Sequence, residues 1–389
     1  MREVAILGVG TTKFGELWDK SFRDGFAEAG IKAIADAGIS GKDMEAIYVG
    51  NMSAGRFIEQ EHVGPLVADA AGLADLGVPA TRIEGACASG ALAFRQGFLA
   101  VASGLHDVVV VAGVEKMTDV PSEEAEAMLA SAGDREWEGF QGATLAALYA
   151  MMARVHMKNY GTTREQMAQV AVKNHLHASK NPEAQFRSAI KLEVVLGSPF
   201  VADPLRVLDG ASLADGSSAI VLAPLEMAKK RGDSIVTVAA SAQASASLAL
   251  HDRTDLAAIP SIGLAGKKAF QMAGIGPTDV DVAELHDIQT IAEIIALEEL
   301  GFCPRGQGGK FTAEGQTTWD GALPVNPGGG LKGCGHPPGA TGVRQIAELT
   351  LQLRGKAGDR QVPNAEIGLA ECHGGTGGSA AVHILRRHR

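Results

Sequence analysis

An internal repeat limits the folds that are open to this chain of 389 residues. Residues 37–49 read AGISGKDMEAIYV and residues 273–285 read AGIGPTDVDVAEL, so several residues of the first segment recur 236 positions later. Farther along, CASGALAFRQ, which begins at Cys87, aligns without a gap with HPPGATGVRQ, which begins at His336. Because the two matches occur in the same order, they indicate a chain built from two related halves.

Helices and strands alternate within each predicted half. Apolar spacing in the first half predicts helices at 22–37 and 92–102 and strands at 45–49 and 106–113. In the second half it predicts a strand at 282–285, helices at 288–300 and 342–353, and a closing hairpin of 367–372 with 379–385. The alternation predicts an α/β fold in which the halves pack as a pseudo-two-fold pair.

Residues 119–205 match neither half, so they are predicted to form an inserted loop domain. The N-terminal half then comprises residues 1–118 and 206–230, and the C-terminal half comprises residues 231–389. The chain carries a net charge of −10, yet the segment from Arg154 to Lys191 is rich in Arg and Lys. That segment is either a solvated helical surface or a docking surface for a phosphorylated ligand, with Arg154, Lys158 and Arg187 as candidate contacts.

Composition excludes several classes of protein. Hydrophobic residues make up 46% of the chain and aromatic residues 5%, with 49 glycines, so the core is predicted to be aliphatic and connected by tight turns. The same composition excludes a disordered or fibrous protein. The negative net charge disfavours binding to nucleic acid or to anionic membranes. No apolar run has the length of a membrane span and the N-terminus lacks signal-peptide features, so a soluble cytoplasmic protein is expected.

The four cysteines have neither metal-ligand spacing nor the density of a disulfide framework, so reduced thiols and no metal site are predicted. Cys87 lies in GACASG, directly before an apolar helix, where the helix dipole and unpaired backbone N–H groups favour the thiolate. A cysteine among small residues can equally be a packed apolar side chain. His336 occupies the equivalent position of the second half, so the repeat predicts that thiol and imidazole face each other as an activated nucleophile.

Two further segments are candidates for chemistry. Cys372 precedes the glycine-rich turn that starts at Gly374, where backbone N–H groups can bind an oxyanion and a second thiol can move a proton. His286 ends a predicted strand, a common place for an active-site group. The glycines around His336, including Gly339, permit close approach of a ligand.

Five motifs in this order resemble the thiolase superfamily over essentially the whole chain, and within it the archaeal and sterol-carrier-type branch. They are GACASG around Cys87, the segment 160–187, ELHDIQTIAE at 284–293, GHPPGATG at 335–342 and CHGGTGG at 372–378. The resemblance implies a duplicated fold in five α/β/α/β/α layers, with the inserted loop domain helping to dock coenzyme A. It also implies a dimer or tetramer.

The resemblance further implies thiolytic cleavage of a 3-oxoacyl-CoA, or the reverse Claisen condensation, through an acyl-cysteine. Cys87 would be the acylated nucleophile, His336 its base, and Cys372 the thiol that moves the α-proton. His286 would form one oxyanion hole with His336 and a water, and the N–H groups of Cys87 and Gly374 would form the other. Coenzyme A would be a substrate, with no cofactor.

The chain departs from its branch after Asp287, where Ile288 and Gln289 replace the usual pair of Ala or Cys followed by Phe. Gln289 is therefore expected to alter the acyl pocket, and an aryl or dicarboxylic 3-oxoacyl-CoA such as benzoylsuccinyl-CoA is one candidate substrate. Two alternatives stay open, namely a thiolase-like acyl-CoA-binding or scaffold subunit and a condensing enzyme of the HMG-CoA or ketoacyl synthase type. The branch also implies a small partner protein with a zinc ribbon and an OB fold.

Overall fold

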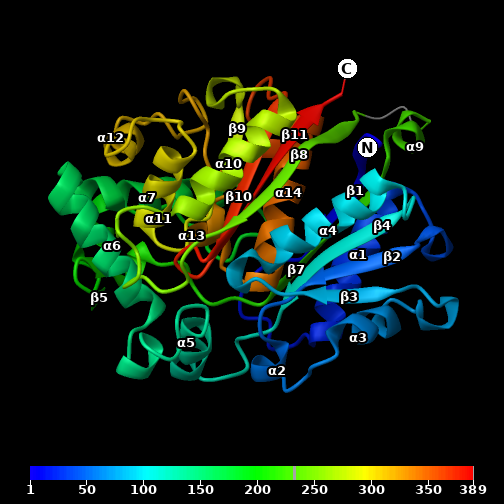
Figure 1. Cartoon of the computed structure of the whole chain (residues 1–389), viewed down its shortest axis with the longest axis horizontal. Coiled ribbons are helices and arrows are strands. Elements are labelled where there is room, and N and C mark those ends of the chain that lie inside the picture. The colour runs from blue at the N-terminus through cyan, green and yellow to red at the C-terminus, as the bar shows by residue number, and fades with distance from the viewer. Residues whose placement is uncertain (231–233, 389) are drawn as a thin grey trace.

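Nine strands form one sheet in the order β3-β2-β4-β7-β1-β8-β11-β10-β9 (Figure 1). The computed structural model describes residues 1–230 and 234–388, so the predicted start of the second half at 231 lies outside the described residues. The first five strands in the sheet come from the N-terminal part of the chain, and their bounds are β1 Val4–Thr11, β2 Ala46–Gly50, β3 Ala80–Ile83, β4 Val109–Glu115 and β7 Gly216–Pro224. The other four are β8 Val236–Ser245, β9 Val282–Glu284, β10 Ile367–Gly374 and β11 Ser379–Arg387.

The order of the strands repeats between the two parts of the sheet. β8, β11, β10 and β9 follow one another as β1, β7, β4 and β2 do. The pairing directions agree as well, because β2 pairs with β4 and β9 with β10 in parallel, whereas β4 with β7 and β10 with β11 are antiparallel. The predicted duplication is thus confirmed. Where the halves meet, β1 and β8 pair through only Ala5 with Thr237 and Ile6 with Val236.

Two helices, α4 (Ser89–Ser103) and α14 (Pro338–Arg354), pack against each other between the two sets of strands (Figure 1). On the outer faces, α1 (Phe22–Ala37), α3 (Val63–Ala70) and α9 (Leu225–Lys229) cover the N-terminal strands, and α10 (Pro260–Ala273) covers β8 and β11. The result is the predicted sequence of five layers. The first residues of α4 and α14 are 249 positions apart, which is the offset of the repeat.

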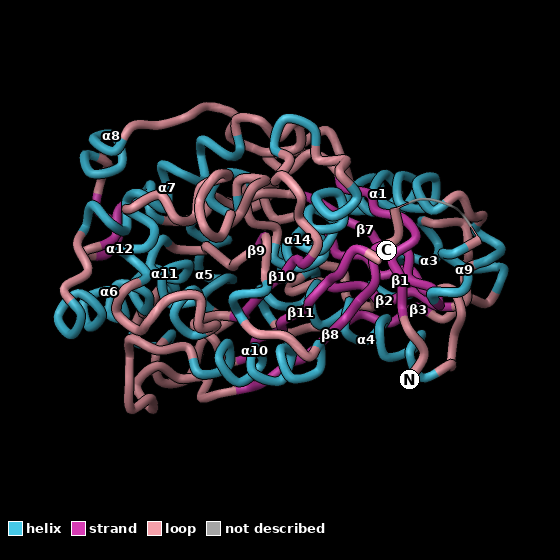
Figure 2. Tube along the Cα trace, turned by 90° about the horizontal axis from the view of Figure 1, so that it is seen from above, coloured by secondary structure: helices cyan, strands magenta, loops and turns pink. Residues whose placement is uncertain are grey.

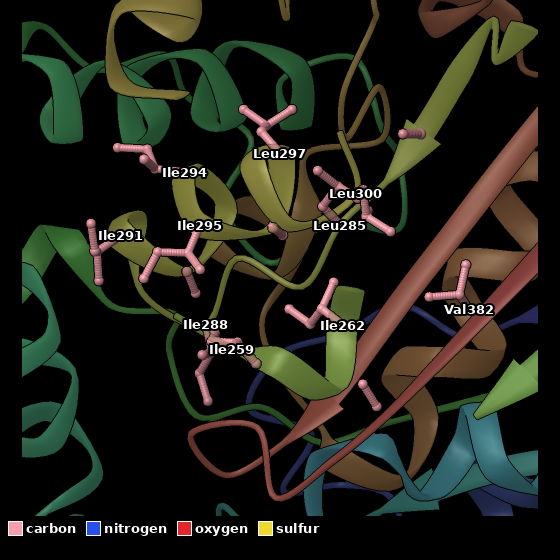
Figure 3. Packing of buried hydrophobic residues seen from close by; sticks show 14 of the residues in the cluster. Ile259, Ile262, Leu285, Ile288, Ile291, Ile294, Ile295, Leu297, Leu300 and Val382 are labelled. Carbon is pink, nitrogen blue, oxygen red and sulfur yellow. The ribbon is translucent and has the colours of Figure 1, made fainter. Parts of the chain in front are cut away.

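The core is aliphatic, as composition predicts. Figure 3 shows its C-terminal part, where isoleucines and leucines of α10 and α11 (Thr290–Glu299) pack on β9 and β11. Each such side chain stabilises the fold by about 1.5–3 kcal/mol through burial. Ile288 and Ile259 belong to the same cluster, and Ile288 also lines the cavity described below.

The inserted region lies beside the C-terminal half (Figures 1 and 2). Its elements are α5 Ser122–Ala130, α6 Leu145–Tyr160, α7 Arg164–Ala178, α8 Leu192–Gly197, β5 Phe200–Ala202 and β6 Leu205–Arg206. Thr144 and Thr163 cap α6 and α7 through hydroxyls that accept backbone N–H groups. Because α7 packs on α11, α12 (Gly308–Ala313) and α13 (Gly330–Cys334), the insertion is anchored to the half that supplies most of the candidate site.

The predicted elements are present with shifted ends. The helices predicted at 92–102 and 342–353 begin earlier, at Ser89 and Pro338, and the helix predicted from Ile288 begins at Thr290. A short helix, α2 (Ala54–Phe57), completes the element list. Within residues 1–230 and 234–388, no helix combines the length and the apolar character that crossing a membrane requires.

Candidate active site

Cys87 lies in a 3₁₀ turn, Ala86–Ala88, that leads directly into α4. Ala86 adopts a left-handed backbone with φ of 53°, which is strained for a residue with a Cβ. The Ser89 hydroxyl holds the turn, because it accepts the Gly85 N–H at 3.0 Å and donates to the Ala86 carbonyl at 2.6 Å. The turn therefore presents the Cys87 thiol at a fixed position inside the protein, where it is fully buried.

The Cys87 thiol meets two imidazoles from the other half. One ligand atom each of Cys87, His286 and His336 lies within 4.8 Å of the other two. His286 follows β9, and His336 precedes α14 at the position equivalent to Cys87. The two equivalent turns thus face each other, as the repeat predicts. These atoms could also hold a metal ion, which sequence spacing did not predict because the three residues are far apart in the chain.

Thr341 determines which nitrogen of His336 carries the proton. Its hydroxyl donates to the Pro337 carbonyl at 3.0 Å and lies 2.8 Å from His336 Nδ1, so Nδ1 must be the donor to the hydroxyl oxygen. Nε2 is then unprotonated, and among the described residues it has no hydrogen-bond partner. Burial, with a smaller effect of His373, lowers the pKa of His336 to about 3. At neutral pH His336 is therefore a neutral imidazole with a free basic nitrogen.

Burial opposes the thiolate form of Cys87 that its place before a helix favours. Burial raises the pKa of the Cys87 thiol to about 12, whereas backbone hydrogen bonds of Gly375 and of Cys87 itself lower it. The negative charge of Glu115 adds to the rise. A base must therefore remove the proton from the thiol form during reaction.

Cys372 lies beside His286 at the end of β10. Its Sγ is 3.4 Å from His286 Nδ1 and 3.2 Å from the Cys87 carbonyl oxygen. Burial, with the nearby carboxylate of Glu371 next, raises the pKa of Cys372 well above its usual value. Burial also lowers the pKa of His286 well below its usual value, so both groups are neutral. A neutral thiol can supply a proton to a carbanion formed next to it.

Asp287 was not predicted to have a role, but it positions the segment before His336. Its carboxylate accepts the N–H groups of Leu331 and Lys332, at 2.7 and 3.1 Å, and the side-chain amide of Asn174 at 2.6 Å. Because Leu331 and Lys332 belong to α13, these bonds tie the His286 segment to the His336 segment. The sequence shows an aspartate directly after His286, but it does not show which groups the Asp287 carboxylate binds in the folded chain.

A cavity of about 840 Å³ reaches this group of residues from the inserted region. His336, Ile288 and Gln289 line it, together with the first residues of α6, Thr144 and Leu145. Gln289 is thus at the cavity, as predicted. The cations in its lining are Lys13 and Arg206.

The basic residues that were predicted to bind coenzyme A do not line this cavity. Arg154, Lys158 and Arg187 are exposed at the surface instead. Arg154 pairs with Asp203 at 2.6 Å. Their contact with coenzyme A stays a prediction.

Gly374 and Gly339 both lie at close backbone contacts. Gly374 lines a second cavity of about 480 Å³ near Ala86. The N–H of Gly339 donates to the buried Glu115 carboxylate at 3.0 Å, and a Cβ on Gly339 would lie 2.5 Å from the Val114 carbonyl oxygen, so this glycine permits close contact between layers. Their roles toward a ligand stay predictions.

Comparisons with known proteins agree with this arrangement. A family model described as the thiolase N-terminal domain matches residues 4–226, and one described as thiolase C-terminal domain-like matches residues 242–387. The acetyl-CoA acetyltransferase of Methanothermobacter thermautotrophicus is 56% identical, with all of both chains covered. Bovine sterol carrier protein 2 is 33% identical over 98% of this chain and 72% of its own length.

Among solved structures, one named Ltp2-ChsH2(DUF35) aldolase superposes with a TM-score of 0.85 at 28% identity. The superposition covers 100% of this chain and 98% of the other.

Proposed function

The chain belongs to the thiolase family and is a thiolase-type acyl-CoA C-acyltransferase, and we propose that it works with Cys87 as the nucleophile and His336 as the base. The main support for this assignment is a distance. The Cys87 sulfur, one ring nitrogen of His286 and one ring nitrogen of His336 all lie within 4.8 Å of one another. Acyl-CoA and CoA are its substrates. The fold is the thiolase fold, in the branch with archaeal and sterol-carrier-type relatives.

The proposed reaction begins when His336 Nε2 takes the proton of the Cys87 thiol. The sulfur attacks C3 of a 3-oxoacyl-CoA, and N–H groups stabilise the oxyanion that forms. The bond between C2 and C3 then breaks, leaving an acyl group on Cys87 and the enolate of a shorter acyl-CoA. Cys372 gives that enolate its proton and regains a proton from the CoA thiol. The CoA sulfur then attacks the acyl group and displaces Cys87, whose sulfur recovers its proton from His336.

Two oxyanion sites are proposed. The first combines His286 with His336, which lines the cavity, and the unpartnered Nε2 of His286 supports a role in binding substrate oxygen. For this role His286 Nε2 carries the ring proton, and the S–H of Cys372 turns from the Cys87 carbonyl oxygen to His286 Nδ1. The second site is proposed to combine the N–H group of Cys87 with an N–H group of the turn that begins at Gly374.

The acyl group is proposed to be acetyl, with acetoacetyl-CoA as the 3-oxoacyl substrate. The relative that is 56% identical is named acetyl-CoA acetyltransferase, which supports a two-carbon acyl group. Gln289 then serves as a polar residue of the cavity wall rather than as a marker of a large aryl pocket.

Mass spectrometry of the intact protein tests this proposal. After incubation with acetoacetyl-CoA, and separately with longer and aryl 3-oxoacyl-CoAs, we expect one acetyl group on a peptide that contains Cys87. Cys87→Ala should lose both the adduct and turnover, whereas the matched variant Cys303→Ala, at a buried thiol away from the site, should keep both. An adduct that persists in Cys87→Ala would contradict the assignment, and an adduct only with larger substrates would contradict the acetyl group.

The organisation of the molecule is also proposed. We assign residues 1–118 and 206–230 to one half, 119–205 to the insertion that docks coenzyme A, and 231–389 to the other half, consistent with the repeated strand order.

A homodimer or tetramer is also proposed. It is supported by β3, which ends the sheet, because an edge strand can pair with a strand of a second copy. A cytoplasmic location is supported by four described cysteines that are all free thiols.

A small partner with a zinc ribbon and an OB fold is proposed as well. Support comes from the similar structure, whose name joins Ltp2 with ChsH2(DUF35). Native mass spectrometry of the protein purified from its own cells would identify both the copy number and a bound partner.

A further inference from the structure

The turn at residues 374–378 is fixed by three side chains from distant segments. Four of its five residues are glycine, so its backbone has unusual freedom in isolation. Three consecutive carbonyl oxygens of the turn accept side-chain hydrogen bonds. These come from the Tyr149 hydroxyl to Gly375 at 2.8 Å, from Arg253 to Thr376 at 2.7 Å, and from the Ser261 hydroxyl to Gly377 at 2.7 Å.

Tyr149 makes a second contact that leads toward His286. Its hydroxyl oxygen lies 2.8 Å from Nε2 of His373, and Nδ1 of His373 lies 2.8 Å from Oε1 of Glu371. The other carboxylate oxygen of Glu371 accepts the backbone N–H of His286 at 3.1 Å. Tyr149, His373 and Glu371 are all fully buried.

The hydrogens in this chain can be assigned. A carbonyl oxygen only accepts, so the single hydroxyl hydrogen of Tyr149 goes to Gly375. Nε2 of His373 must then donate to the phenol oxygen, and one further proton lies between His373 and Glu371. In the part of the chain that the structure describes, the unpartnered buried atoms include Nε2 of His286 and of His336 but no side-chain atom of Tyr149, His373 or Glu371. Both ring nitrogens of His373 have hydrogen-bond partners, which fits a structural role. Nε2 of His286 and Nε2 of His336 have none among the described residues, so these two atoms are free to contact substrate.

We propose that Tyr149 is a positioning residue that holds the turn at residues 374–378 beside the Cys87 segment and, through His373 and Glu371, holds the backbone of His286. The inference rests on the proposed role of Cys87. It deepens that role, because the turn next to the nucleophile is held in place from the inserted region. Residues at the start of the same helix α6 line the large cavity, so one helix contacts both the cavity and the turn.

Tyr149→Phe tests the proposal, because it removes only the hydroxyl from a side chain that keeps its buried ring. We expect kcat with acetoacetyl-CoA to fall by about 10- to 100-fold with little change in KM, since a partner that positions a reacting group typically has an effect of this size. Cys87 should also react more slowly with iodoacetamide across neutral to alkaline pH, because the turn beside its sulfur is no longer held in place. Neither readout should change in the matched variant Tyr160→Phe, at the other end of α6, whose hydroxyl binds Arg305.

A double variant tests the route through His373. If Tyr149 acts through that imidazole, Tyr149→Phe with His373→Gln should be no slower than the slower single variant. Wild-type kcat and alkylation rate in Tyr149→Phe would overturn the proposal, as would an equal loss in Tyr160→Phe. Full turnover of Cys87→Ala would instead overturn the proposed function itself, whatever the result at Tyr149.

Discussion

The proton on His336 is placed by a residue five positions along the same segment. A neutral imidazole acts as a base only through the nitrogen that lacks hydrogen, so an imidazole in the wrong tautomer would turn an N–H toward Cys87. The Thr341 hydroxyl prevents this, because its hydrogen is committed to the Pro337 carbonyl and its oxygen is left to accept from Nδ1. The first turn of α14, which follows the base in the chain, thus sets the tautomer of His336.

Thr341→Val should reduce kcat by about 10- to 100-fold, a typical effect of removing the partner that orients a histidine. Valine preserves the shape of the side chain but removes the acceptor for Nδ1–H, so both tautomers become accessible. Steady-state kinetics with acetoacetyl-CoA measure the loss. Thr350→Val is the matched control, because the Thr350 hydroxyl lies in the same helix and bonds only the Ile346 carbonyl. Equal kinetics of the two variants would show that the tautomer is set otherwise.

The sequence allowed the reacting residues to be predicted, but not their supports. Cys87 and His336 were found because the repeat aligned them, and His286 and Cys372 because each stands at the end of a strand. Thr341, Asp287 and Tyr149 act through contacts that exist only in the folded chain. The rise of the Cys87 pKa by burial was not predicted for the same reason, because the desolvation of a thiol depends on what the fold places around it.

At the scale of elements, the contact between α4 and α14 depends on glycines at their first turns. A Cβ on Gly90 would lie 2.5 Å from the Gly339 carbonyl oxygen, and one on Gly113 of β4 would lie 2.1 Å from the same atom. Such distances are too short for any side chain. The two helices can therefore bring Cys87 and His336 together only because glycines let their backbones approach.

Gly90→Ala should lower the free energy of unfolding by about 1–3 kcal/mol, because the backbones must separate to admit a methyl group. Gly30→Ala, in the middle of α1, should instead raise it by about 0.4–1 kcal/mol, since alanine restricts the unfolded chain. No described atom lies within 4 Å of a Cβ at Gly30 apart from its own helix backbone and chain neighbours. Urea unfolding of both variants measures the difference, and equal effects of the two changes would contradict this account.

The same glycines explain which helix ends were missed. The helix at 22–37 was predicted correctly because its capping residue and apolar spacing are local features. The starts of α4 and α14 were placed too late, because SGA and PGATG are typical of loops. Packing between the layers makes these segments helical, and no local pattern records that packing.

At the scale of the whole molecule, Asp215 joins the two ends of the insertion to the N-terminal half. Its carboxylate accepts Lys116 Nζ and the Met117 N–H, both at 2.7 Å, and the Leu17 N–H at 3.1 Å. The Thr118 N–H and hydroxyl add two more bonds. The chain leaves the sheet for the insertion near residue 118 and returns to the sheet near residue 215. The buried Asp215 carboxylate therefore holds both of these connections together.

Asp215→Asn should lower the free energy of unfolding by about 3 kcal/mol near neutral pH, because Lys116 loses a buried counter-charge. Burial alone would raise the pKa of Asp215, but the hydrogen bonds from Lys116, Thr118 and the backbone lower it overall. The stabilisation is therefore present above the ordinary aspartate pKa of about 4 and is lost as pH falls through the lower folded value.

Urea unfolding over a pH series should show the wild type and Asp215→Asn converging in acid. Asp107→Asn removes an exposed pair with Arg2 and should change stability by less than about 1 kcal/mol. A constant gap between wild type and Asp215→Asn down to strongly acidic pH would contradict the ionic origin of the effect.

The overall plan of two halves and an insertion followed from the sequence, because a repeat and its interruption are visible in one chain. The pairing of the two sets of strands did not, since β1 and β8 join through two residue pairs that no pattern distinguishes from other strand residues. The cavity was missed for a similar reason, because segments from several parts of the chain line it.

The equivalent turns before α4 and α14 have a consequence for how such an enzyme can arise. If one half formed a symmetric dimer with itself, the two-fold axis would place the same residue at both turns, giving two thiols or two imidazoles. Joining the halves in a single chain removes that constraint, so each turn can change independently. The division of labour between Cys87 and His336 is thus closed to a symmetric pair of identical halves and open to two halves that have become different, as in this chain.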